Sequence, residues 1–168
     1  MMCEQLYQKI LYHSIVGYLT ITSDNHYIRK ISFGKQELLS GSVECNEHPL
    51  LLKAEQQLIE YLDGKRTEFD LPYQAYGTEF QKSVWTALEN IPYGAVKTYG
   101  MIAKEIHASK ASRAVGGACH NNPIAIIIPC HRVVGSNGNM TGFAAGINIK
   151  ERLLQLEKQN CENTESFL

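Results

Sequence analysis

The sequence has no long apolar run. No stretch of its 168 residues approaches the length of a membrane-spanning helix, and the first ten residues, MMCEQLYQKI, lack an apolar signal region. We therefore expect a cytoplasmic protein that does not enter a membrane. At 44% hydrophobic residues, the chain has enough apolar side chains to bury a substantial core.

Cysteine-pairing motifs are also missing. The five cysteines are scattered and none belongs to a CxxC pair, so the sequence favours neither a zinc knuckle nor a disulfide framework. We expect reduced thiols, no metal and no cofactor, with a free thiol available as a nucleophile. The cysteines are Cys3, Cys45, Cys119, Cys130 and Cys161.

Acidic residues are scarce between residues 91 and 150. The whole chain has a net charge of −1, yet this segment has Glu105 as its single acid and six basic residues, which leaves it at +5. Such segregation is typical of a polyanion-binding surface, although a solvated basic face without a ligand has the same composition. The basic residues are Lys97, Lys104, Lys110, Arg113, Arg132 and Lys150.

The first part of the chain combines strand and helix patterns. Strand-like alternation extends to about Phe33, with the SDN sequence at residues 23–25 predicting a turn between two strands. Residues 34–49 are polar and indicate a loop. Leucines at helical spacing predict a helix over residues 48–65, which Gly64 would end. This half therefore reads as an α/β domain with a small antiparallel sheet.

The second part is mostly helical. Pro and Gly in residues 72–77 mark a boundary, so we expect domains at residues 1–76 and 77–168. Thr78 can cap one helix and Thr98 a second, and Ser109 or Ser112 opens a third. The last two helices, joined by a tight turn, have the helix-turn-helix arrangement. A final amphipathic helix is expected to turn Ile149, Leu153 and Leu156 inward.

Small side chains dominate the second helix of this pair, ASRAVGGACHN at residues 111–121. A glycine inside a helix costs about 1 kcal/mol relative to alanine, and Gly116 and Gly117 stand together. Close approach of the backbone to a ligand explains them, and so does tight packing against another helix.

The stretch IIIPCHRVVG, residues 126–135, places a thiol beside an imidazole. We expect a short apolar strand that ends at Pro129. Cys130 is then either a small buried side chain, as most cysteines are, or a nucleophile at the base of a pocket with His131 as its neighbour.

Several motifs together resemble one family. GTEFQKSVW, IPYGAVKTYGMIA, SRAVGGACHNNP, IIIPCHRVVGSNG, TGFAAG and KxxLLQLE occur in the order and spacing of the O6-alkylguanine-DNA alkyltransferases, the methylated-DNA–protein-cysteine methyltransferases. The resemblance is close over residues 78–157 and holds in outline for the first 77 residues. It implies an RNase H-like N-terminal domain, and a C-terminal domain that turns O6-alkylguanine out of duplex DNA and takes the alkyl group once, irreversibly.

The resemblance also implies residue roles. Cys130 is the alkyl acceptor, His131 takes its proton through a water, Glu157 supports His131, and Asn122 braces the active-site turn. A base is needed because a free thiol is only a few per cent thiolate at neutral pH. Asn122 is equally compatible with a plain Asn-Pro turn.

On the DNA side, the resemblance implies that the small-residue helix enters the minor groove of double-stranded DNA and that the protein acts as a monomer. Arg113 fills the gap left by the flipped base, or it is a simple phosphate contact. Tyr99 meets the flipped guanine and helps to protonate it. The remaining implied positions are Ser112, Ala114 and Gly116 at the DNA, and Phe143, Ala144 and Val133 at the substrate pocket.

The chain departs from the family pattern at several positions. Phe143 replaces a tyrosine of many members, and Cys119 occupies an apolar position on the DNA-facing helix where relatives carry larger side chains. Asp24 and Arg29 occupy two positions that are zinc ligands in some relatives, so we expect no metal. Cys130 excludes the damage-sensing class that has tryptophan there.

Two other functions use parts of the same pattern. A cysteine hydrolase would employ the same Cys–His–Glu set with turnover and needs no basic helix. A DNA-binding regulator would keep the helix-turn-helix and tolerate loss of Cys130. The size of the accepted alkyl group and activity on O4-alkylthymine are not encoded in a recognisable pattern.

Overall fold

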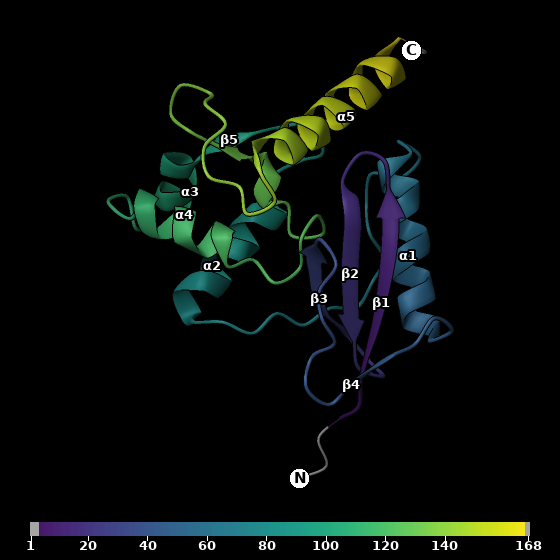
Figure 1. Cartoon of the computed structure of the whole chain (residues 1–168). Helices are drawn as coiled ribbons and strands as arrows, with labels where there is room; N and C mark the ends of the chain where they lie inside the picture. Colours follow the sequence, from purple (N-terminus) through teal and green to yellow (C-terminus); the bar gives the residue numbers. More distant parts are fainter. Residues whose placement is uncertain (1–3, 167–168) are drawn as a thin grey trace. The chain divides into compact units, whose positions relative to one another are not determined.

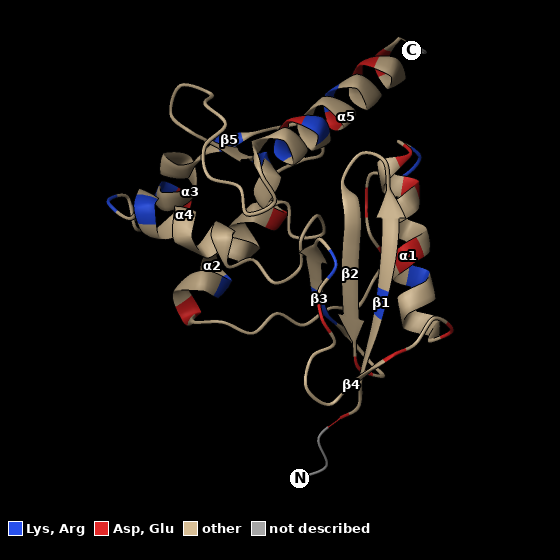
Figure 2. Ribbon diagram, in the orientation of Figure 1, with Lys and Arg blue, Asp and Glu red and all other residues tan. Residues whose placement is uncertain are grey.

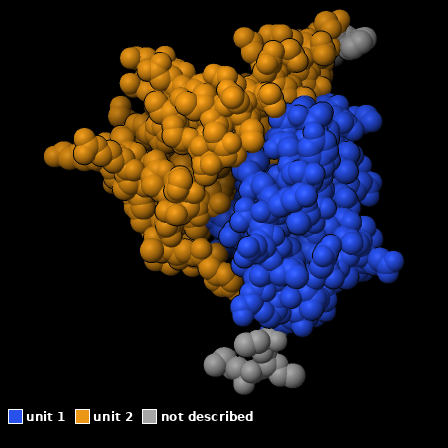
Figure 3. Space-filling model, in the orientation of Figure 1, with its two compact units in different colours: residues 1–75, 123–125 blue, residues 76–122, 126–168 orange. Residues whose placement is uncertain are grey.

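The computed structural model describes residues 4–166, and the chain divides into two compact units (Figures 1 and 3). Unit 1 is the chain up to Ala75 together with Pro123–Ala125, and unit 2 is Tyr76–Asn122 with the chain from Ile126 onward. Cys3 lies outside the described residues. Across residues 4–166, no helix combines the length and apolar character that crossing a bilayer would require.

Unit 1 is a four-stranded sheet covered on one face by a helix. The strand order is β3-β2-β1-β4, and β1 (Leu6–His13), β2 (Gly17–Ser23) and β3 (Ile28–Phe33) are antiparallel neighbours. β4 (Ser42–Glu44) pairs with β1 in parallel. α1 (Pro49–Leu62) packs on β1 and β2 (Figure 1). The expected α/β unit is confirmed.

Two details of the sheet differ from the sequence-based expectation. The run before residue 23 is two strands, because the chain reverses at residues 14–16. The amide of Val16 donates to the carbonyl of His13, and Gly17, the first residue of β2, has a φ of 74°. The alternation continues across this turn, so the pattern alone did not reveal it. β4 lies in the segment expected to be a loop, since three paired residues leave little periodicity.

The helix prediction for unit 1 is confirmed, with α1 ending within the expected range. Gly64, at a φ of 75°, lies just beyond the last helical turn, a backbone conformation that glycine adopts without strain. Apolar side chains of α1 and of the strands form a fully buried core. Its members include Leu19, Ile21, Leu51 and Leu58.

Unit 2 contains four α-helices among the described residues. α2 (Glu79–Glu89), α3 (Tyr99–Glu105) and α4 (Ser112–His120) pack on one another, and α5 (Ile147–Glu165) follows a Gly-rich loop (Figure 1). The α3–α4 pair is the predicted helix-turn-helix.

The expected caps are confirmed for two of these helices. The hydroxyl of Thr78 accepts from the amide of Gln81, whose side chain accepts from the amide of Thr78, a complete capping box. The hydroxyl of Thr98 accepts from the amide of Met101. α4 begins at Ser112, one of the two serines expected to open it, and its N-cap is Ala111, which makes no side-chain hydrogen bond.

The segment before the nucleophile candidate is not a strand. Ile124 makes an isolated bridge with Ile31 inside unit 1, and then Ile126, at a φ of 72°, turns the chain away from extended geometry. A β-branched residue rarely adopts such a φ, which is why the apolar run suggested a strand. The chain continues into a short 3-10 helix, η1 (Cys130–Arg132), and then β6 (Val133–Val134), which pairs in parallel with β5 (Lys97–Thr98).

Candidate active site

Cys130 is the first residue of η1 and is almost completely buried, with 7% of its surface exposed. Pro129 precedes it outside helical geometry, and the amide of Cys130 bonds back to the carbonyl of Ile128 at 2.8 Å. Asn122 holds the same turn, because its Nδ2 donates to the Ile128 carbonyl at 2.7 Å. The thiol is therefore fixed by a braced turn.

Burial raises the pKa of the Cys130 thiol, and several neighbours oppose that effect. The side chain of Asn122, the positive charge of Lys150 and the backbone amides of Cys130 and His131 all favour the thiolate. Burial still prevails, so the resting group is a thiol. Attack on an electrophile then requires a base that removes the proton.

His131 is the adjacent base, and it is completely buried. Its Nε2 lies 2.8 Å from Oε1 of Glu157, which is also completely buried on α5. Burial lowers the pKa of His131, while the hydrogen bond and charge of Glu157 raise it in part. A neutral ring that donates Nε2–H to a carboxylate keeps the basic lone pair on Nδ1. Cys130, His131 and Glu157 are thus all buried in unit 2.

The basic surface is smaller than the sequence suggested. Arg132 is buried and binds Glu157, with Nη2 2.8 Å from Oε1. Lys150 is also fully buried, and Lys97 contacts Glu105 at 2.5 Å. Of the six basic residues between residues 91 and 150, three are exposed, namely Lys104, Lys110 and Arg113. They belong to α3, to the turn before α4 and to α4 (Figure 2).

Lys150 is a site residue that the sequence did not single out. Its Nζ donates to the carbonyl of Thr141 at 3.3 Å and lies 5.8 Å and 5.9 Å from the ring centres of Tyr99 and Phe143. Burial lowers the pKa of Lys150, and nearby Cys130 and Cys119 raise it in part. Its position on the buried face of α5, three residues before Leu153, is the signal that could have identified it.

Tyr99 begins α3 and lines an open pocket of about 470 Å³. Its hydroxyl donates to the Thr141 carbonyl at 3.2 Å, which ties the helix to the Gly-rich loop. Burial raises the pKa of Tyr99, so the phenol keeps its proton. The pocket is lined by Tyr99, Ser112, Arg113, Gly116, His120, Thr141 and Gly142.

The structure therefore brings three of the expected DNA-contacting residues and Tyr99 to one pocket. Ala114 is exposed on the same helix, and Ala144 is exposed on the loop before α5. Val133 is fully buried in β6. His120, at the end of α4, is a lining residue that the sequence did not predict; it lies seven residues after Arg113, hence on the same helix face.

The surroundings of Gly116 and Gly117 show whether close packing accounts for the small residues of α4. A side chain added there would meet Cε1 of Tyr99 at 3.9 Å, which is ordinary contact, whereas Gly117 has open space around it. Packing therefore does not require glycine at either position.

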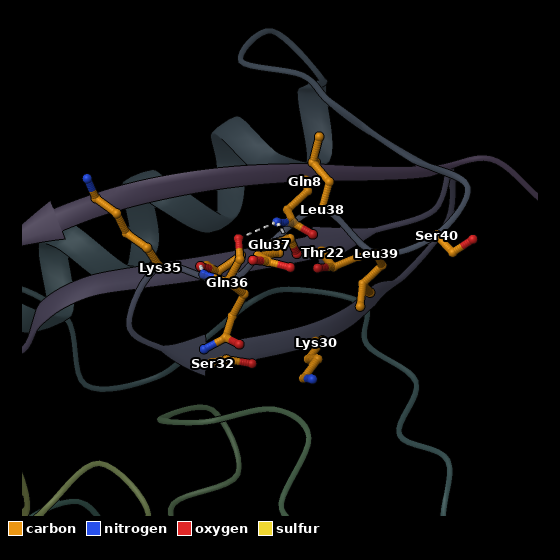
Figure 4. Close-up of a pocket in the computed structure, with 11 residues that line it drawn as sticks. Gln8, Thr22, Lys30, Ser32, Lys35, Gln36, Glu37, Leu38, Leu39 and Ser40 are labelled. Atoms are coloured by element: carbon orange, nitrogen blue, oxygen red, sulfur yellow. Dashed lines mark hydrogen bonds between the residues drawn. The ribbon is translucent and has the colours of Figure 1, made fainter.

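A second hollow lies on unit 1, over the sheet face and beneath the loop after β3 (Figure 4). Its volume is about 490 Å³. Gln8 forms part of the floor and donates to the carbonyls of Gln36 and Glu37. Neither a cysteine nor a histidine is among its lining residues, so it provides no thiol that could accept an alkyl group.

The two positions that correspond to zinc ligands in some relatives form an ion pair in unit 1. The buried carboxylate of Asp24 binds the guanidinium of Arg29 and accepts from the amides of His26 and Tyr27 at 2.7 Å each. Across residues 4–166, no three His, Cys, Asp or Glu side chains are grouped as metal ligands. Arginine is not a metal ligand, so these residues do not fit a zinc ion.

Both units match domains of one known protein family. Residues 79–159 match the 6-O-methylguanine DNA methyltransferase DNA-binding domain, and residues 7–75 match its ribonuclease-like domain. The methylated-DNA–protein-cysteine methyltransferase of Methanosarcina acetivorans is 46% identical over 149 residues, covering 88% of this chain and 96% of that protein. The Mycolicibacterium paratuberculosis protein of the same name is 40% identical over 88% of this chain and 90% of its own length.

Solved structures agree with the sequence comparison. The Mycobacterium tuberculosis OGT, crystallised in complex with DNA, superposes with a TM-score of 0.86 at 40% identity, covering 92% of this chain and 94% of that one. A structure of O6-methylguanine methyltransferase from the same organism gives a TM-score of 0.84 at 39% identity.

Proposed function

This chain belongs to the 6-O-methylguanine DNA methyltransferase family, and from that premise we propose how its residues perform the family's reaction. The protein binds DNA and repairs O6-alkylguanine by direct reversal, moving the alkyl group to one of its own cysteines. We assign the acceptor to Cys130. The observation that carries this assignment is the buried His131–Glu157 pair that follows Cys130 in the same unit.

In the proposed step, His131 takes the thiol proton and the sulfur of Cys130 attacks the alkyl carbon. A carbon–sulfur bond forms as the bond from that carbon to guanine O6 breaks. The departing guanine gains a proton from Tyr99, whose raised pKa keeps the phenol protonated at rest; the phenolate then regains a proton from solvent while the His131 imidazolium releases one. The thioether product is stable, so each molecule acts once.

The target base must leave the duplex before the sulfur can reach it, because O6 is otherwise stacked and paired. We propose that α4 lies in the minor groove, where the small side chains of Ser112, Ala114 and Gly116 permit close approach. Arg113 is exposed and lines the pocket, so it is placed to fill the gap in the stack. Phe143, Ala144 and Val133 are the proposed surroundings of the flipped base, and Asn122 holds the turn.

We also propose that the protein acts as a monomer in the cytoplasm. A monomer suffices, because every group that the reaction uses lies in unit 2. The four described cysteines Cys45, Cys119, Cys130 and Cys161 are free, and a nucleophilic thiol persists best in the reducing cytoplasm. Domain limits at residues 1–76 and 77–168 likewise stay a prediction.

One incubation tests the assignment. Protein is mixed with duplex DNA carrying radiolabelled O6-methylguanine, and the label is followed by peptide mapping. We expect at most one label per chain, on the peptide containing Cys130. Label released as a small molecule would indicate a hydrolase, and label retained on DNA would indicate a binder without chemistry.

A further inference from the structure

Arg132 encloses the carboxylate that supports His131. It is 7% exposed, its Nε lies 3.1 Å and 3.0 Å from the two carboxylate oxygens of Glu157, and its Nη2 lies 2.8 Å from Oε1. Nη1 donates to the carbonyl of Ile91 at 2.8 Å. The planar guanidinium is therefore fixed at both ends, in the geometry that favours a charged acceptor.

A backbone amide completes the surroundings of this carboxylate. The amide of Gly94 donates to Oε2 of Glu157 at 3.1 Å. Gly94 has a φ of 79°, and a side chain there would meet Sγ of Cys161 at 2.5 Å, so the approach depends on glycine. Both oxygens of Glu157 accept N–H groups, and a proton on either oxygen would oppose one of those donors. The site is built for a carboxylate, and a carboxylic acid fits it poorly.

We propose that Arg132 is a positioning residue that keeps Glu157 ionised throughout the reaction, so that the proton removed from Cys130 stays on His131 and does not pass to Glu157. This inference rests on the proposed function, because it concerns the proton that leaves Cys130. The bonds that form and break are those of the proposed step, and the proton removed from Cys130 remains on His131 while Tyr99 protonates the departing guanine.

The charges around the pair agree with this assignment. Burial opposes ionisation of Glu157, yet hydrogen bonds from His131 and Arg132 and their charges lower its pKa to about 2. Burial lowers the pKa of His131, and the charges of Arg132 and Lys150 lower it further. The other titratable groups nearby are Cys130, which adjoins His131, and Tyr93 and Cys161, which lie near Glu157. Arg132 therefore restrains proton uptake by the pair as a whole.

The first test is the pH profile of alkyl transfer to Arg132 variants, measured with free O6-benzylguanine so that DNA binding does not contribute. In Arg132→Met, the pair loses a neighbouring positive charge and binds its proton more readily. The acid side of the profile should therefore move to higher pH by about one unit. Arg132→Lys keeps the charge and should keep the midpoint, with a slower plateau. A midpoint that is unchanged in Arg132→Met, with a uniform loss of rate, would reduce Arg132 to a structural role.

The second test needs no variant and covers the case in which Arg132→Met fails to fold. The wild-type protein, labelled with carbon-13 at glutamate carboxyl groups and nitrogen-15 in histidine rings, is titrated by NMR through the range in which imidazole gains its proton. We expect the His131 ring to become imidazolium while Glu157 remains a carboxylate. A Glu157 carboxyl signal that protonates together with His131 would overturn the proposal. Absence of alkyl transfer in the wild type would instead refute the proposed function, which the NMR titration does not depend on.

Discussion

Nε2 of His131 lies 2.8 Å from Oε1 of Glu157, and both side chains are completely buried. A buried carboxylate costs free energy unless it is paired, so this contact couples the two residues strongly. It also selects the histidine tautomer with its lone pair on Nδ1. The base in the proposed step is therefore the pair, and the imidazole does not act alone.

His131 and Glu157 should consequently behave as a unit. We expect His131→Ala, Glu157→Gln and the double variant to slow transfer to free O6-benzylguanine by similar factors, because removal of either residue disables the same function. Single-turnover rates on the three variants provide the measurement, and circular dichroism confirms folding. Losses that multiply in the double variant would show independent roles.

Cys130→Ala should bind alkylated DNA and transfer nothing, because the variant lacks only the nucleophile. Cys119→Ala is the matched control. Burial, with the charge of Cys130, raises the pKa of Cys119 to about 12, so its thiol is a poor nucleophile and its removal should leave transfer within about twofold of wild type. Gel-shift assays and label transfer would measure the two properties. Comparable labelling of another cysteine in Cys130→Ala would contradict the assignment.

The sequence predicted those parts of unit 2 that depend on local chemistry. Thr78 and Thr98 cap their helices as expected because capping is a contact within one turn. Arg132 and Lys150 were expected on a basic surface and are buried instead. Hydropathy assigns a charged residue to the surface, and only the fold reveals the buried partner, here Glu157 from α5, that permits burial.

Acid should destabilise the protein through Glu157. Burial opposes the shift, but the bonds and charges of His131 and Arg132 lower the pKa of Glu157 to about 2, whereas an unfolded glutamate has a pKa of about 4.3. The resulting stabilisation is fully present above about pH 4.3 and is lost as the pH falls through about 2, on the order of 3 kcal/mol in total. His131 adds to this effect: because its pKa is lowered in the folded protein, the free energy of unfolding also decreases as the pH falls below about 6.5, the pKa of an unfolded histidine.

Urea unfolding at a series of pH values would measure this dependence. Trp85 is the single tryptophan and lies buried in unit 2, where its Nε1 donates to the Ala118 carbonyl at 2.9 Å, so its fluorescence reports on that unit. Glu157→Gln should flatten the fall of unfolding free energy in acid. Glu151→Gln, on the exposed side of the same helix, is the control and should retain the wild-type slope. If the unfolding free energy of Glu157→Gln falls with acid as steeply as that of wild type, Glu157 is not the source of the acid sensitivity.

Arg113→Ala separates two roles of an exposed arginine that lines the pocket beside Tyr99. A residue that fills the gap in the base stack stabilises the extrahelical base. Its loss should therefore slow repair of paired duplex at least about tenfold more than reaction with free O6-benzylguanine, which needs no flipping. The defect should shrink on a single strand, where unstacking costs less. Transfer rates at saturating protein on the free base, single strand and duplex provide the comparison.

Lys110→Ala is the matched control for this experiment, because Lys110 is exposed in the turn just before α4 and is suited to a phosphate contact. It should weaken binding evenly on all DNA, lower the salt slope by about one unit, and leave the saturated rate on duplex near wild type. If Arg113→Ala follows the same pattern as Lys110→Ala, Arg113 is an anchor to the backbone. A rate defect confined to paired DNA places Arg113 in the stack, since a phosphate contact alone does not distinguish a paired lesion from an unpaired one once the protein is saturating.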